Sequence, residues 1–172
     1  VFYHQERMGL DGKAFTVYKF RSMYHDVERE SGPVWARDDD PRCTPVGRLM
    51  RRLDLDELPQ CWNVLRGDMA LVGPRPEMPF IGEKYEPWQR RRLDVPQGIT
   101  GLWQIAGRKQ LPLHHNLEYD FYYIRNWTLL LDVVILRIAD AIAIRVEATA
   151  AERALQHEQG IRIVRILIPV IR

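Results

Sequence analysis

The sequence predicts an α+β protein that is mainly helical, with a small β-hairpin near its N-terminal end and short strands elsewhere. Residues 2–20 combine aromatic and β-branched residues with turn-forming residues in their middle, which is typical of a hairpin. From residue 44 onward, apolar side chains recur at helical spacing between glycine and proline residues. A chain of 172 residues, 46% of them hydrophobic, is large enough for one domain with a substantial core. We expect residues 2–144 to form that domain and residues 145–172 to be a tail.

Gly9 and Gly12 supply the turn of the expected hairpin, because glycine adopts the backbone conformations that tight turns require. Residues 26–42 follow the hairpin and are polar and interrupted by prolines, so we expect an irregular loop there. The acidic run at residues 38–40 is interpreted as part of a solvated loop in preference to a metal site.

The first helix is expected to begin at Thr44 and Pro45. Threonine can cap a helix N-terminus, and proline fits the first helical position, where its missing N–H is not needed. The residues that follow form an apolar stripe at i, i+3, i+4 and i+7 spacing, which is typical of an amphipathic helix: Val46, Leu49, Met50 and Leu53.

A second helix start is predicted immediately afterwards, because Asp54 and Glu57 have the spacing of a capping box. Pro59 removes one backbone donor, so we expect a kink or a tightened turn at that point. Gly67 is expected to end the helix. Residues 69–72 are then predicted to form a short buried strand.

The second half of the chain is expected to contain a charged helical segment at residues 77–92, a glycine-rich loop at 96–107 and a long helix at 116–144. Residues 127–144 are strongly apolar but include charged residues, whereas a membrane-spanning helix needs about 20 apolar residues in succession. A helix lying in a membrane interface and a buried core helix both fit this pattern. The tail at 145–172 suggests no function.

Composition excludes some classes of protein. The net charge is only +2, and stacking aromatic residues are not interleaved with the arginines at 48–52 and 90–92, so a nucleic-acid binder is the least favoured class. These arginines are either solvated faces or a surface for phosphates or acidic lipid headgroups.

Cys43 and Cys61 have neither metal-site nor disulfide spacing, which favours a reducing, cytoplasmic environment.

An adjacent pair of carboxylates, Asp56 and Glu57, lies at the start of the second predicted helix. Unpaired backbone N–H groups and the helix dipole favour negative charge there, so we expect Asp56 to be ionised and available as a nucleophile. Adjacent helical residues point about 100° apart, so the two acids can have different roles. In the alternative interpretation, both acids only stabilise the helix start.

One arginine is presented by a stiff loop. Pro74 and Pro76 fix φ on either side of Arg75 and disfavour a helix there. The planar guanidinium suits bidentate contact with a phosphate, although a surface turn with an incidental arginine is the simpler alternative. Arg108, which follows the glycine-rich loop, and Lys19 are further candidates for phosphate binding.

Taken in order, these motifs resemble the catalytic domain of the bacterial sugar transferases, the monotopic phosphoglycosyl transferases. The resemblance extends over residues 2–144. The matching blocks are residues 5–9, 19–23, 44–51, 56–60, 63–69, 72–76, 98–104, 119–124 and 131–132.

The resemblance implies transfer of a sugar-1-phosphate from a UDP-sugar to polyprenyl (undecaprenyl) phosphate, with release of UMP. Asp56 would attack the phosphorus next to the sugar and form a covalent intermediate, while Glu57 would deprotonate or orient the acceptor phosphate. Mg²⁺ bound at or near Asp56 would neutralise the diphosphate. The phosphate-binding and other substrate-binding residues implied by the resemblance are Lys19, Arg75, Arg108, Asp120 and Asp132.

The resemblance also implies a place on the cytoplasmic face of the bacterial inner membrane. Members of the family have a hydrophobic re-entrant helix before the first matching block, so the protein is expected to be monotopic or anchored by a segment preceding Val1. Self-association into a homo-oligomer is left open by the sequence. The alternative function is a non-catalytic module that docks on a membrane or partner, or an inactive fragment of such an enzyme.

Overall fold

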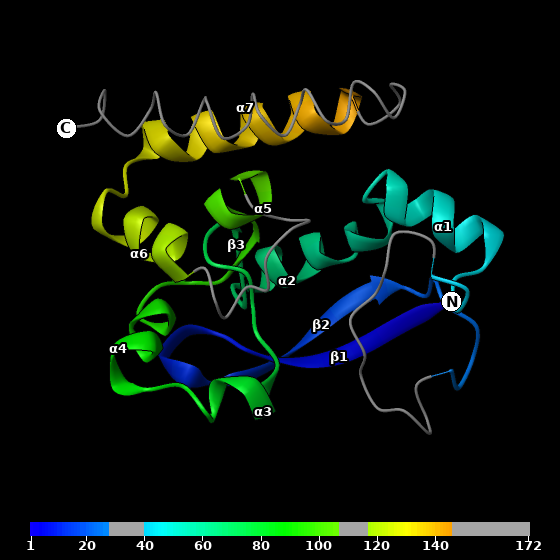
Figure 1. Ribbon diagram of the computed structural model, residues 1–172, viewed down its shortest axis with the longest axis horizontal. Coiled ribbons are helices and arrows are strands. Elements are labelled where there is room, and N and C mark those ends of the chain that lie inside the picture. The colour runs from blue at the N-terminus through cyan, green and yellow to red at the C-terminus, as the bar shows by residue number, and fades with distance from the viewer. Residues whose placement is uncertain (28–39, 107–116, 146–172) are drawn as a thin grey trace.

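The computed structural model describes residues 1–27, 40–106 and 117–145 (Figure 1). Within these residues, helices pack around two small sheets, so the predicted mixture of helices, an N-terminal hairpin and short strands is confirmed. The strands are β1 (Phe2–Met8), β2 (Ala14–Phe20), β3 (Ala70–Val72) and β4 (Gly98–Thr100). The helices are α1 (Pro45–Arg52), α2 (Gln60–Arg66), α3 (Pro79–Gly82), α4 (Pro87–Arg90), α5 (Leu102–Ala106), α6 (Leu117–Arg125) and α7 (Leu129–Arg145).

Strands β1 and β2 form the predicted antiparallel hairpin, and the turn between them includes Gly12 with φ of 72°. This left-handed backbone is the conformation that favours glycine. Tyr3 pairs with Lys19 across the hairpin, and Gln5 pairs with Val17. Lys19 lies two positions after the buried Val17 in β2, so the two side chains project to the same face of the hairpin. Strand β2 contacts the segment that follows α1.

Helix α1 begins as predicted, because the Thr44 hydroxyl accepts a hydrogen bond from the Gly47 amide at 2.9 Å and Pro45 occupies the first helical position. Its predicted apolar stripe is only partly covered, however: Val46 and Leu49 are exposed, whereas Met50 and Leu53 are partly buried.

The predicted capping box between Asp54 and Glu57 is wrong. Asp54 has a left-handed backbone with φ of 54° and makes no side-chain capping bond, while the Glu57 side chain is directed elsewhere. Residues 55–57 form a separate 3-10 turn, and α2 begins only after Pro59, in agreement with the break predicted at that proline. Gly67 ends α2 with φ of 82°, as predicted.

Two predictions for the middle of the chain need correction. Residues 77–92 do not form one helix, because Pro79 and Pro87 each take a first helical position and start the short helices α3 and α4. The segment at 96–107, predicted as a loop, contains strand β4 and helix α5. Strand β4 pairs with β3 in parallel, a long-range interaction that local sequence patterns do not reveal.

The loop after β3 is held tightly against the backbone around β4. The Gly73 amide donates to the Thr100 carbonyl at 2.9 Å, and the Gly98 amide donates to the Pro74 carbonyl at 2.9 Å. A Cβ atom on Gly73 would lie 2.5 Å from the Pro96 carbonyl oxygen. Glycine is therefore required for this close approach, which fixes the start of the loop that carries Arg75.

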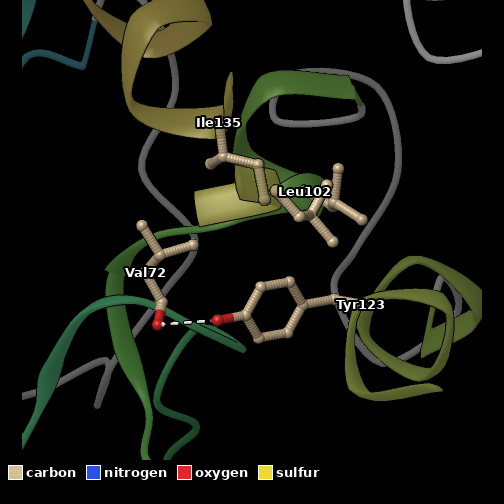
Figure 2. Packing of buried hydrophobic residues seen from close by; sticks show 5 residues of the cluster. Val72, Leu102, Tyr123 and Ile135 are labelled. Carbon is tan, nitrogen blue, oxygen red and sulfur yellow. Dashed lines mark hydrogen bonds between the residues drawn. The ribbon is translucent and has the colours of Figure 1, made fainter. Parts of the chain in front are cut away.

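The predicted single helix at residues 116–144 is two helices, α6 and α7. The Thr128 hydroxyl accepts a hydrogen bond from the Leu131 amide at 3.1 Å and so caps a new helix start. One face of α7 is buried, since Leu131 and Ile135 join Val72, Leu102 and Tyr123 in the main hydrophobic cluster (Figure 2). The neighbouring residues Leu129, Leu130 and Val133 are exposed.

We predict that Gly98→Ala destabilises the protein by roughly 3 kcal/mol, because the added methyl group would collide with the backbone of Gly73 and Thr100. Gly67→Ala is the matched control: no atom lies within 4 Å of the position that its Cβ would take, so only its left-handed backbone adds a cost of about 1 kcal/mol. Urea unfolding measures both free energies. Equal losses in the two variants would contradict the close approach at Gly98.

Candidate active site

Glu57 connects three distant parts of the chain. Its Oε1 atom accepts a hydrogen bond from Lys19 Nζ at 2.7 Å and another from Arg75 Nη2 at 2.9 Å. Lys19 comes from β2, Glu57 from the 3-10 turn before α2, and Arg75 from the loop after β3. All three side chains are largely buried. The structure therefore brings together three of the site residues that the sequence nominated.

The charges in this cluster are strongly coupled. Burial alone would raise the pKa of Glu57, but the Arg75 guanidinium and the Lys19 ammonium outweigh it and hold the pKa well below its usual range. Burial also lowers the pKa of Lys19; the attraction of Glu57 opposes this effect and the repulsion of Arg75 adds to it. Glu57 is thus a firmly ionised carboxylate and a weak base.

Asp56 is in a different environment from its neighbour. It is only 7% exposed, and its side chain makes no hydrogen bond or ion pair with another residue in the described part of the chain. Burial raises the pKa of Asp56, and this effect exceeds the opposing attraction of Lys19. Asp56 lies in a short 3-10 turn and not in the first turn of a helix, and burial is the largest influence on its pKa; that it is ionised at neutral pH stays a prediction.

Arg7 lies close to this cluster, although the sequence did not nominate it as a site residue. Its Nη2 atom donates to Gln5 Oε1 at 2.6 Å. Burial, together with the charge of Arg75, lowers the pKa of Arg7 to about 10. Strand periodicity provides a signal: Tyr3 pairs with Lys19, and Arg7, four residues further along β1, projects to the same face.

Asp120, nominated as a substrate-binding residue, lies in a buried ion pair. Its Oδ2 atom accepts a hydrogen bond from Arg92 Nε at 2.9 Å, and Arg92 also donates to the Arg75 carbonyl at 2.7 Å. The carboxylate of Asp120 is thus linked to the Lys19–Glu57–Arg75 cluster through Arg92.

Asp132, another nominated residue, lies in the first turn of α7 and is linked to β3 through Tyr123. It accepts hydrogen bonds from the Tyr123 hydroxyl at 2.8 Å and from Trp127 Nε1 at 3.1 Å. The Tyr123 hydroxyl is also 3.2 Å from the Val72 carbonyl oxygen (Figure 2). Arg108, the remaining nominated residue, lies outside the described residues, as do residues 38 and 39 of the acidic run.

Residues 1–144 match the family described as bacterial sugar transferase. This match covers most of the chain, so the protein belongs to the bacterial sugar transferase family, as the motifs had indicated.

Individual relatives agree with this assignment. The chain is 45% identical over 136 residues to the uncharacterized sugar transferase EpsL of Bacillus subtilis, which covers 79% of the chain and 66% of that protein. It is 43% identical over 148 residues to the undecaprenyl-phosphate galactose phosphotransferase of Salmonella typhimurium, covering 78% of the chain and 31% of that protein. It is 41% identical over 141 residues to the UDP-N-acetylgalactosamine-undecaprenyl-phosphate N-acetylgalactosaminephosphotransferase of Aeromonas hydrophila, with coverage of 78% and 33%. The chain therefore spans between about a third and two thirds of the length of these relatives.

We predict that Glu57→Gln lowers the free energy of unfolding by roughly 2 kcal/mol at neutral pH, because Lys19 and Arg75 then lose their shared counter-charge. The folded-state pKa of Glu57 is depressed, so its contribution is complete above its unfolded pKa of about 4.3 and is lost as pH falls through the lower folded value. Urea unfolding of wild type and variant between pH 3 and 7 measures this. Glu83→Gln on the exposed surface is the control, and a pH-independent difference for Glu57→Gln would contradict the ion cluster.

Proposed function

We propose that this chain contains the catalytic part of a phosphoglycosyl transferase. The enzyme moves a sugar-1-phosphate from a UDP-sugar to polyprenyl phosphate, such as undecaprenyl phosphate, and releases UMP. The polyprenyl diphosphate-sugar product starts the assembly of an exopolysaccharide, capsule, O-antigen or other glycan.

The observation that carries this proposal is the placement of Asp56 beside the Lys19–Glu57–Arg75 cluster. Burying a carboxylate costs free energy unless it is paired or binds a ligand, and Asp56 is buried with no ion-pair partner among the described residues. Cations next to it suit a diphosphate. Two relatives are named for phosphosugar transfer involving undecaprenyl phosphate, and one of these names includes a UDP-sugar, which supports the proposed substrates.

In the first step, a carboxylate oxygen of Asp56 attacks the phosphorus atom of the UDP-sugar that lies next to the sugar. A P–O bond to Asp56 forms while the P–O bond to UMP breaks, and UMP leaves with that electron pair. Arg75 contacts the phosphate oxygens and stabilises their developing charge. The attack requires the carboxylate form of Asp56; burial opposes that form, and the charge of the nearby Lys19 ammonium favours it.

In the second step, an oxygen of polyprenyl phosphate attacks the same phosphorus. The P–O bond to Asp56 breaks, which regenerates the carboxylate and leaves the sugar on a diphosphate. Of the two roles expected for Glu57, orienting fits its environment better than deprotonating, because its low pKa makes it a weak base. Glu57 holds Lys19 and Arg75 in place for both steps.

Magnesium belongs to the proposal as a cofactor at or near Asp56. No group of three or more metal-ligating side chains occurs within residues 1–27, 40–106 and 117–145. Mg²⁺ commonly binds one or two carboxylates together with substrate phosphates and water, so the buried Asp56 carboxylate, which has no ion-pair partner among the described residues, fits it. The ion would supply charge neutralisation of the diphosphate when bound.

We also propose that α1 and α2 contact the membrane that contains the lipid acceptor, on its cytoplasmic face. Among the described helices, none is long and apolar enough to cross a bilayer. These two helices and the segment between them (Figure 1) nevertheless expose five large apolar side chains, those of Val46, Leu49, Leu58, Trp62 and Leu65. The arginines that they also expose are Arg48, Arg52 and Arg66. Exposed apolar residues accompanied by arginine suit an interface with anionic lipids.

We predict that Asp56→Asn lowers the rate of UMP release from a UDP-sugar by at least about a thousandfold, because the nucleophile is lost. A luminescent UMP assay over UDP-glucose, UDP-galactose and UDP-N-acetyl sugars, with short polyprenyl phosphate, measures this in membranes that contain the full-length protein. The control is Asp94→Asn, an equivalent change on the exposed surface.

Mass spectrometry then tests the covalent step. With donor alone, the wild type should gain the mass of a sugar phosphate on Asp56, while Asp56→Asn should not. Undiminished UMP release in Asp56→Asn would eliminate the proposed nucleophile.

We predict that Trp62→Ser raises the apparent KM for polyprenyl phosphate in anionic vesicles several-fold and leaves the KM for the UDP-sugar unchanged, because membrane contact serves only the lipid substrate. Trp88→Ser is the matched control, since Trp62 and Trp88 are 57% and 54% exposed. Identical acceptor kinetics in the two variants would argue against contact through α1 and α2.

A further inference from the structure

Arg92 is the largest fully buried side chain of the described structure, with 0% of its surface exposed. It belongs to a run of three arginines that the sequence presents as one cationic cluster, yet Arg90 and Arg91 are exposed. The fold therefore singles out one arginine of the three. A buried guanidinium is strongly unfavourable unless its donors and its charge are satisfied, so its partners indicate what it does.

The three partners of Arg92 come from different parts of the chain. Its Nε donates to Asp120 Oδ2 at 2.9 Å, its Nη1 donates to the Tyr85 hydroxyl at 2.8 Å, and its Nη2 donates to the Arg75 carbonyl oxygen at 2.7 Å. Asp120 supplies the counter-charge, with an Arg92 Nη2–Asp120 Oδ2 distance of 2.8 Å. Of the three acceptors, only the Arg75 carbonyl belongs to the loop that enters the candidate active site.

The backbone of Arg92 is itself fixed. The Gln97 side-chain amide donates to the Arg92 carbonyl at 3.1 Å and to the Val95 carbonyl at 2.9 Å. Gln97 directly precedes Gly98, whose amide donates to the Pro74 carbonyl at 2.9 Å. Arg92 and β4 therefore hold the loop at two successive residues, Pro74 and Arg75, through its backbone, whereas Glu57 holds it through the Arg75 side chain.

We propose that Arg92, held by Asp120, is a positioning residue that fixes the backbone of Arg75 and thereby aims its guanidinium at the substrate diphosphate. This inference rests on the proposed function. Asp120 then acts through Arg92, and its carboxylate is not a direct ligand of substrate phosphate or of a cation. The two flanking prolines fix φ at positions 74 and 76, and Pro76 narrows ψ at Arg75; within that range, the tether holds the Arg75 carbonyl in one direction.

The effect on catalysis follows from geometry. A displacement of about 1 Å in a group that binds the transition state can reduce the rate on the order of a hundredfold. Lysine at position 92 keeps the positive charge but provides a single ammonium group, which cannot reach all three acceptors in the directions that a planar guanidinium reaches. Asparagine at position 120 keeps an oxygen acceptor but removes the counter-charge of Arg92.

A double-mutant cycle in the full-length protein, assayed in membranes by UMP release, tests this inference. Arg92→Lys and Asp120→Asn should each lower kcat/KM for the UDP-sugar by about 10- to 100-fold when Arg75 is present. On an Arg75→Ala background, each should cause a further loss of less than about threefold, because the group that they position is gone. Arg91→Lys, an equivalent change at the exposed neighbour, should leave kcat/KM unchanged in both backgrounds.

Two kinetic outcomes would overturn the inference. If Asp120→Asn is equally harmful with and without the Arg75 guanidinium, Asp120 acts directly on substrate or only on global folding. If Arg92→Lys retains wild-type kcat/KM, the tether is unimportant. Should Arg92→Lys fail to fold, Asp120→Asn alone completes the cycle with Arg75→Ala.

Hydrogen–deuterium exchange provides a measurement that does not depend on turnover. In Arg92→Lys and Asp120→Asn, the amides of Gly73, Arg75, Glu77 and Met78 should exchange at least about tenfold faster, while those of the β1–β2 hairpin remain unchanged. Unchanged exchange at these four amides would overturn the tether even if the wild type turned over no donor. Absence of UMP release from every donor by the wild type, accompanied by the expected exchange, would instead count against the proposed function.

Discussion

The site depends on the interaction of one carboxylate oxygen with two cations. Glu57 Oε1 receives Lys19 Nζ at 2.7 Å and Arg75 Nη2 at 2.9 Å, and these contacts connect residues that are 38 and 18 positions apart in the chain. The hairpin, the 3-10 turn and the proline-bounded loop therefore meet at a single atom. Three charges are stable in such a poorly hydrated place only when their geometry is fixed, so the surrounding elements act mainly to hold their distances. The close glycine contacts between residues 73 and 98 serve this purpose, since they bring the Arg75 loop within reach of Glu57.

Two adjacent carboxylates acquire opposite properties in this arrangement. Glu57 is surrounded by positive charge and has a strongly depressed pKa, whereas Asp56 is buried without a described partner and has a raised pKa. A pair of titratable groups whose environments separate their pKa values is a recognised feature of sites that divide chemical roles. One member of the pair is committed to structure and charge balance, and the other remains available for bonding. The sequence predicted that the two acids could have different roles, but the charged environments that distinguish them come from the fold.

Local features were predictable where neighbouring residues determine them. The Gly12 turn, the Thr44 cap and the ends of α2 at Pro59 and Gly67 all follow from backbone preferences that act within a few residues. The parallel pairing of β3 with β4 and the isolation of Arg92 from its two exposed neighbours depend on contacts between distant segments, which periodicity does not encode. The Asp54–Glu57 pattern misled for a related reason: Glu57 has stronger partners in Lys19 and Arg75 than any backbone amide, so tertiary charge pairing replaced the local cap. Motif resemblance nominated Lys19, Asp56, Glu57 and Arg75, but it did not indicate Arg7 or the link from Asp120 through Arg92.

Holding Arg75 by its backbone and by Glu57 leaves much of its side chain available. A guanidinium has five N–H donors, and within the described structure the Glu57 contact engages the Nη2 atom. The backbone contact from Arg92 involves the Arg75 carbonyl and uses none of these donors. In the proposed reaction, Arg75 can therefore bind an incoming phosphate while it remains paired with Glu57, so substrate binding need not first break a buried ion pair. That order of events matters because separating a buried pair would consume binding energy before any chemistry occurs. A guanidinium fixed in direction before substrate arrives instead stabilises negative charge that develops on the phosphoryl oxygens with little reorganisation, which is the condition under which electrostatic catalysis is most effective.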